Sequence, residues 1–166
     1  MPNVAPALLL AGVALTLAAC QRAPRPLAAG VDACDYCRMT VSDTRFGGEI
    51  ESRTGKLYTF DAVECLASFY LDASSRDDVR RAWVSDFDSG RLVPVDSAVF
   101  LQGSSLNSPM GQGLVAFALT ADSTLRRHGG RQVRWSDVLD TMRQRHLTPG
   151  VPQRHDTSFD TARSHR

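Results

Sequence analysis

Residues 55–63 read GKLYTFDAV and residues 130–138 read GRQVRWSDV, so two matching stretches lie 75 positions apart. Each begins with a glycine at a turn, continues as a short strand and reaches a large aromatic residue. Each then has a polar residue able to cap a helix, followed by the start of an apolar helical pattern. This repetition predicts an α+β domain built from two similar β-β-α halves packed together. Chance likeness between two ordinary αβ units is the alternative.

The segments around these stretches complete each half. Asp61, with Glu64 three residues later, matches the capping-box pattern for a helix start, and Ser136 has the same place in the second half. The predicted domain covers residues 32–146, with halves at about 32–90 and 91–146. Turn residues and alternation predict strands at residues 46–53, 56–60, 81–87, 98–102, 114–120 and 131–135, and helices at residues 62–71 and 137–145.

The first residues have the pattern of an export signal. Residues 5–19 are uncharged and mostly apolar, too short a run for a membrane span but typical of a signal-peptide core. They end in Leu17-Ala18-Ala19-Cys20, which resembles the lipobox of bacterial lipoproteins, although residues 1–19 contain no Lys or Arg. We therefore expect residues 1–19 to be a signal peptide and Cys20 to be lipidated as the new N-terminus. A plain secretory signal with a chance cysteine is the alternative.

The remaining terminal segments are predicted to lie outside the core. Residues 20–31 contain Pro24 and Pro26 and are predicted to be an extended tether behind the lipidated cysteine. Gln21, in place of the aspartate typical of inner-membrane retention, favours the outer membrane, with the domain facing the periplasm. Residues 147–166 are rich in Pro, Arg, His, Asp, Thr and Ser, which predicts a disordered tail.

Composition excludes several classes of function. Hydrophobic residues make up 43% of the 166-residue chain and charged residues 22%, which is typical of a soluble globular domain. A net charge of +1 gives no reason to expect nucleic-acid binding. The sequence has no Gly-rich phosphate loop, no Ser/His/Asp spacing and no paired-carboxylate signature, so no enzymatic motif stands out.

The chemistry of the sequence is concentrated in Cys34-Asp35-Tyr36-Cys37-Arg38-Met39. Two thiols and one thioether within six residues are soft donors, which favour Cu(I), zinc or iron–sulfur centres. Four interpretations are open for Cys34 and Cys37: a thioredoxin-like redox pair, a structural disulfide between them or with Cys65, a zinc site, and a Cu(I) site. With Cys20 lipidated, the odd number of cysteines mildly favours metal or redox chemistry.

The context of the motif narrows these alternatives. A redox pair typically follows a strand and opens a helix, whereas this pair follows a proline-rich segment; a structural zinc site lacks its second cysteine pair. Met39 lies two residues after Cys37, so the two side chains project to one side of an extended segment. Met110, in a polar loop, is a candidate third ligand. Cu(I) ligation and a disulfide with ordinary packing remain the two interpretations, and Cys65 is expected to be a small buried residue.

The motifs together resemble the NosL family, the accessory lipoproteins of nitrous-oxide reductase. The resemblance rests on Cys34-x-x-Cys37-x-Met39, Phe46, Gly55-Lys56, Phe60-Asp61, Cys65-Leu66 and Ser108-Pro109-Met110-Gly111. It implies a fold related to the organomercurial lyase MerB. It implies Cys37 and Met39 as the firmest copper ligands, then Met110, with Cys34 as a ligand or a redox lock on Cys37. Arg38 is a departure, because many members have glycine there.

The resemblance also implies a function. A NosL protein is a periplasmic, membrane-anchored Cu(I) chaperone, expected to be a monomer and to work by ligand exchange without catalysis. It would receive copper from a transporter complex and pass it toward the copper–sulfide cluster of nitrous-oxide reductase during denitrification. The rival hypotheses are a thiol–disulfide oxidoreductase and a metal-free lipoprotein that scaffolds a respiratory complex.

Overall fold

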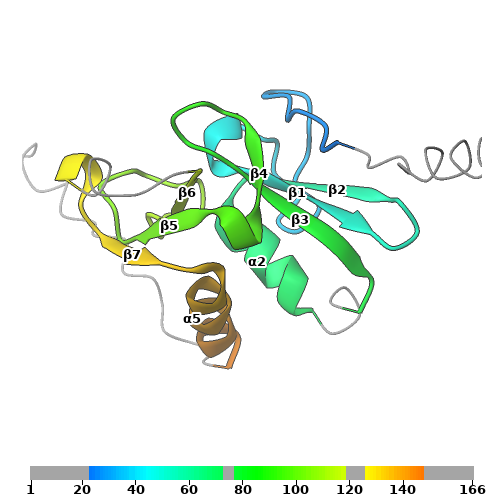
Figure 1. The fold of residues 1–166 in the computed structure, drawn as a ribbon. Coiled ribbons are helices and arrows are strands. Elements are labelled where there is room, and N and C mark those ends of the chain that lie inside the picture. The colour runs from blue at the N-terminus through cyan, green and yellow to red at the C-terminus, as the bar shows by residue number, and fades with distance from the viewer. Residues whose placement is uncertain (1–22, 73–76, 119–125, 148–166) are drawn as a thin grey trace, which may run out of the picture.

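The computed structural model describes residues 23–72, 77–118 and 126–147, which form two antiparallel sheets and two main helices (Figure 1). The first sheet has the order β2-β1-β3-β4 and the second the order β6-β5-β7. The α+β fold class is confirmed. The strands are β1 (Gly48–Ser52), β2 (Leu57–Phe60), β3 (Val79–Ser85), β4 (Leu92–Pro94), β5 (Val99–Gln102), β6 (Val115–Phe117) and β7 (Arg131–Val133).

The hairpin β1–β2 is the predicted one. Its turn contains Gly55, whose φ of 85° lies in the left-handed region that glycine adopts without steric cost. The backbone N–H of Ser52 donates to the carbonyl of Lys56 at 2.8 Å, and the register pairs Gly48 with Phe60. Both strands are shorter than predicted at their ends, whereas β3 begins two residues earlier than predicted and β4 was not predicted.

The helices α2 (Val63–Leu71) and α5 (Trp135–Leu147) pack against each other, and α2 also packs on β1 and β2 (Figure 1). Tyr70 meets the indole of Trp135 edge-on, with 5.6 Å between ring centroids, and Trp135 in turn lies 5.7 Å from Phe100 of β5. One hydrophobic cluster therefore runs through both halves. It includes Ile50, Phe60, Val63, Leu66, Phe100, Ala116, Val133, Val138 and Met142.

The two predicted helix caps are wrong. Ala62 is the N-cap of α2 and makes no side-chain capping bond, while Asp61 and Glu64 are both buried and have other partners. The second helix begins at Trp135, ahead of Ser136, and the Asp137 carboxylate accepts the backbone N–H of Arg134. In the first half, tertiary contacts withdraw the polar residues from the helix end, so the local capping pattern is not realised.

The end of the predicted tether lies against the first sheet. The Arg25 guanidinium pairs with Asp32 at 2.9 Å, and the Arg25 backbone N–H donates to the buried carboxylate of Glu49 in β1, also at 2.9 Å. The predicted signal peptide, Cys20 with its predicted lipidation, and most of the predicted tail lie outside the described residues. Within the described residues, neither helix has the length and apolar character needed to cross a bilayer.

Candidate metal centre

Four side chains that are distant in the sequence meet beside the start of α2. They are Cys34, Cys37, Asp61 and Cys65, and one potential ligand atom from each lies within 4.8 Å of all the others. Cys34, Asp61 and Cys65 are almost completely buried, whereas Cys37 is half-buried. Three thiols and a carboxylate at this separation form a donor set that could hold a metal ion.

The loop that carries Cys34 and Cys37 is a tight turn fastened to β2. The backbone N–H of Cys34 donates to the carbonyl of Met39 at 2.8 Å, and that of Arg38 donates to the carbonyl of Cys34 at 3.0 Å. Arg38 has a φ of 68°, in the left-handed region that favours glycine. Arg38 therefore occupies a backbone conformation that glycine would adopt without steric cost.

Two reciprocal hydrogen bonds fix the loop over the end of β2. The Asp35 backbone N–H donates to the Thr59 carbonyl, and the Thr59 backbone N–H donates to the Asp35 carboxylate, each at 2.8 Å. These bonds place both cysteines of the loop next to the residues that follow Phe60.

Asp61 and Cys65 complete the cluster from the junction between β2 and α2. They are four residues apart around the helix start, a spacing that places side chains on one side. The S–H of Cys37 donates to Asp61 Oδ1 at 3.5 Å. The loop thus supplies two ligands, and the strand–helix junction supplies the other two.

Hydrogen bonds and burial give the three thiols of the cluster different pKa values. The S–H of Cys65 donates to the Cys34 sulfur, and the pKa of Cys34 is lowered from its ordinary 9.0 to about 6. The backbone N–H groups of Asp61 and Cys37 also lower this pKa, while burial raises it. The hydrogen bond between Cys65 and Cys34 raises the pKa of Cys65. Burial raises the pKa of Cys37. At neutral pH the metal-free cluster therefore holds one thiolate and two thiols.

Comparisons with known proteins place the chain in a family. The sequence pattern of the NosL family matches residues 27–143 of the chain. The chain belongs to the NosL family.

Two named NosL proteins are similar to it. The copper-binding lipoprotein NosL of Stutzerimonas stutzeri is 27% identical over 125 residues, which cover 68% of this chain but only 65% of that protein. The crystal structure of the copper chaperone NosL from Shewanella denitrificans matches with a TM-score of 0.57 at 25% identity, covering 69% of this chain and 96% of the other.

Of the four residues predicted to bind metal, the structure brings two, both cysteines, into the cluster. Cys34 and Cys37 come together in the cluster. Met110 is partly buried and packs against the hydrophobic cluster that contains Cys34 and Cys65. Met39 has 46% of its surface exposed, because its loop turns at Arg38 and does not continue as the extended segment that the sequence predicted. That Met39 and Met110 are metal ligands of this NosL chain remains a prediction.

Sequence reasoning missed Asp61 and underrated Cys65. Asp61 was assigned to a helix cap because its local pattern fitted one, and Cys65 was expected to be a small buried residue. Cys65 is indeed buried, at 1% exposure, but it is also a member of the cluster. A usable signal was present: a carboxylate and a thiol at positions i and i+4 share one side of a helix start.

The acidity of Cys34 in this NosL protein gives a direct test of the metal-free cluster. We expect the ultraviolet absorbance of thiolate to rise with a midpoint near pH 6 and the amplitude of one group. Because this folded-state pKa lies below that of the unfolded chain, Cys34 adds stability as the pH rises from about 6 toward 9 and loses it as the pH falls through 6. A pH titration of the reduced protein measures the absorbance, and urea denaturation at a series of pH values measures the change in stability.

Variants of Cys34 and Cys65 test whether the absorbance step belongs to the Cys34 thiol. Cys34→Ser removes the step near pH 6, while Cys65→Ala moves it upward because the Cys34 sulfur loses its hydrogen-bond donor. Cys65→Ser restores a donor and keeps the step low. A first thiolate that appears only near pH 9 in the parent protein would contradict the hydrogen-bond arrangement.

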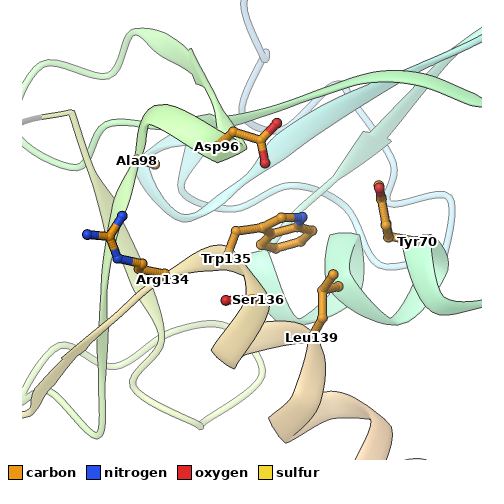
Figure 2. Close-up of a pocket in the computed structure, with 7 residues that line it drawn as sticks. All are labelled: Tyr70, Asp96, Ala98, Arg134, Trp135, Ser136 and Leu139. Atoms are coloured by element: carbon orange, nitrogen blue, oxygen red, sulfur yellow. The ribbon is translucent and has the colours of Figure 1, made fainter.

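A pocket lies at the other end of α2, with a volume of about 310 Å³ (Figure 2). Figure 2 shows the indole of Trp135 at its centre, with Asp96 above it, Tyr70 and Leu139 on one side, and Arg134 on the other. Its full lining is Tyr70, Asp96, Ala98, Arg134, Trp135, Ser136 and Leu139. The cluster residues contribute nothing to this lining, so the pocket is separate from the metal centre.

Proposed function

We propose that the chain is a Cu(I) chaperone that carries one ion at the cluster of Cys34, Cys37, Asp61 and Cys65. The observation that carries this function is the convergence of three sulfurs and one carboxylate within 4.8 Å in a member of the NosL family. Thiolates are the ligands that Cu(I) prefers. The names of the two relatives, a copper-binding lipoprotein and a copper chaperone, support the same ion.

The cluster supports a binding mechanism based on charge and proton release. The Cys34 thiolate neutralises the monovalent ion, and Cys37 loses its proton when it binds. The Asp61 carboxylate accepts the Cys37 S–H, so this hydrogen bond must break when Cys37 releases its proton and binds the ion. No bond of a substrate is broken in this sequence, and the chain acts by exchanging ligands.

The surroundings of the loop support transfer between proteins. The described part of the chain has three exposed large hydrophobic residues, Val31, Tyr36 and Met39. All three lie on or beside the loop that carries Cys34 and Cys37. Exposed apolar side chains grouped in this way are typical of an interaction site. Cys37 and Met39 are the outer sulfurs, so an incoming donor replaces them first, while Cys34 and Cys65 hold the ion from the buried side.

The resemblance to the family supports a more detailed proposal. We infer that the protein is anchored through lipidated Cys20 on the periplasmic side of a membrane, more in keeping with the outer than the inner one. It acts as a monomer that takes Cu(I) from a transporter complex and delivers it for assembly of the copper–sulfide cluster of nitrous-oxide reductase. Met39 and Met110 complete the ligand set during capture and release.

The geometry argues against the thiol–disulfide oxidoreductase. A redox-active cysteine needs a low pKa and access to its substrate. Here the two properties fall on different residues: Cys34 has the lowered pKa but is 0% exposed, while burial raises the pKa of the more accessible Cys37.

Anaerobic loading tests the proposed function. The reduced protein, without its first 19 residues, is mixed with excess Cu(I), desalted and weighed intact by mass spectrometry. We expect one copper per chain, three sulfur scatterers or more in X-ray absorption, and retention of Cu(I) when zinc is in excess. A mass loss of two hydrogens without copper, or displacement of Cu(I) by zinc, would refute the proposal.

A further inference from the structure

The loop that carries Met110 is built around one buried hydroxyl, that of Ser108. Ser108 is 5% exposed, and its Oγ accepts the backbone N–H groups of Gln112 and Gly113, both at 3.1 Å. The backbone N–H of Gly111 donates to the Ser108 carbonyl at 2.8 Å. Met110 therefore lies within a turn that closes on Ser108, and the position of the turn follows that of this hydroxyl.

The same hydroxyl fastens the loop to the helix of the metal centre. Ser108 donates to Glu64 Oε1 at 2.6 Å, a bond between residues 44 positions apart. Glu64 is 2% exposed and immediately precedes Cys65 in α2. The Glu64–Ser108 hydrogen bond is thus a direct connection between the Met110 loop and the helix turn that presents Cys65.

Stability alone is a poor explanation for this connection. Burying a carboxylate is unfavourable, and replacing both members of a buried polar pair by apolar groups of similar volume is often neutral or stabilising. Within the described residues, the second oxygen of Glu64, Oε2, has no hydrogen-bond partner, so the burial of the group is only partly compensated. A buried polar link between the Met110 loop and the helix that presents Cys65 is expected to fix the position of one relative to the other.

We propose that the Glu64–Ser108 hydrogen bond is a positioning link that holds the Met110 thioether in place to complete the Cu(I) site formed by Cys34, Cys37 and Cys65. The inference rests on the proposed function. Neither Glu64 nor Ser108 touches the ion in this proposal. Both act through Met110, in the way that residues around a ligand tune a metal site without binding the metal.

A double-mutant cycle in Cu(I) affinity tests the link. Ser108→Ala, Met110→Leu and the double variant are titrated anaerobically against a competing Cu(I) chelator. We expect Ser108→Ala to lose about tenfold in affinity, in the range typical of residues behind a metal ligand, and Met110→Leu to lose at least as much because it removes the thioether itself. We expect the double variant to lose no more than Met110→Leu alone, because the link acts only through that thioether. X-ray absorption should show one sulfur fewer in Ser108→Ala.

Variants of Glu64 separate positioning from folding. Glu64→Gln keeps an oxygen that accepts the Ser108 hydroxyl and is expected to retain affinity within about threefold. Glu64→Leu removes the acceptor at similar volume and should reproduce the loss seen in Ser108→Ala, even if that variant folds poorly. Thermal unfolding of each metal-free variant reports folding independently of copper.

The failing outcomes are distinct. Full affinity in both Ser108→Ala and Glu64→Leu, or losses that multiply when Ser108→Ala is combined with Met110→Leu, would overturn the positioning link. Full affinity in Cys37→Ser would instead overturn the proposed function, whatever the cycle shows.

Discussion

Replacing Cys37 with serine lowers the Cu(I) affinity by roughly a hundredfold to a thousandfold. Structural zinc sites with four ligands bind with about 10–16 kcal/mol, or about 2.5–4 kcal/mol for each ligand, which corresponds to a loss of this size. A serine hydroxyl keeps its proton at neutral pH and is a hard donor, so it cannot replace the thiolate. Competition with a Cu(I) chelator under anaerobic conditions measures the change.

Methionine variants provide matched controls for this experiment. Met142, at 3% exposure in α5, belongs to the hydrophobic core, so Met142→Leu should leave Cu(I) affinity unchanged. Met39→Leu should weaken binding by less than Cys37→Ser, because a neutral thioether holds the ion less tightly than a thiolate. Wild-type affinity in Cys37→Ser would rule out the cluster as the copper site.

The secondary structure was predictable where local chemistry decides it. The Thr54-Gly55 turn and the alternation on either side of it define the β1–β2 hairpin, and the apolar spacing of Val138 and Met142 defines the inner face of α5. β4 was missed because its sequence, Leu92-Val93-Pro94, ends in a proline, which is not typical of a strand, and it exists by pairing with β3. Such an edge strand depends on its neighbour and not on its own sequence.

The docking of the N-terminal segment was unpredictable for a related reason. Pro24 and Pro26 favour an extended chain, which is correct as local conformation but says nothing about contacts. Arg25 reaches Glu49, 24 residues away, and covers a carboxylate that is 0% exposed in the middle of β1. Neither residue carries a pattern that identifies the other.

The metal centre was half predictable. Cys34 and Cys37 stand out because two thiols three residues apart are rare in a chain with four cysteines. Asp61 and Cys65 join them only because two hydrogen bonds between Asp35 and Thr59 lay the loop across the end of β2. Asp61 was not predicted as a member of the cluster because its local pattern already fits a helix cap, and such a pattern gives no information about tertiary contacts.

The second large effect is expected on stability, from Phe60→Ala. Phe60 is 0% exposed, packs with Phe69 of α2 at 5.1 Å between ring centroids, and precedes Asp61. Removing a fully buried ring leaves a cavity and costs about 3–5 kcal/mol in the free energy of unfolding. Because domains of this size are stable by only about 5–15 kcal/mol, the metal-free variant should be close to unfolding at room temperature. Urea denaturation measures the change.

Tyr58→Ala is the matched control for Phe60→Ala. Tyr58 lies two residues earlier in β2, on the same face of the strand, and its ring also contacts Phe69, with centroids 4.8 Å apart. It is only partly buried, so its removal should cost no more than about 2 kcal/mol. Cu(I) binds the folded state and should raise the midpoint of Phe60→Ala, since a ligand stabilises the state that binds it. Equal losses from the two variants would contradict the expectation that complete burial at the end of β2 decides the size of the loss.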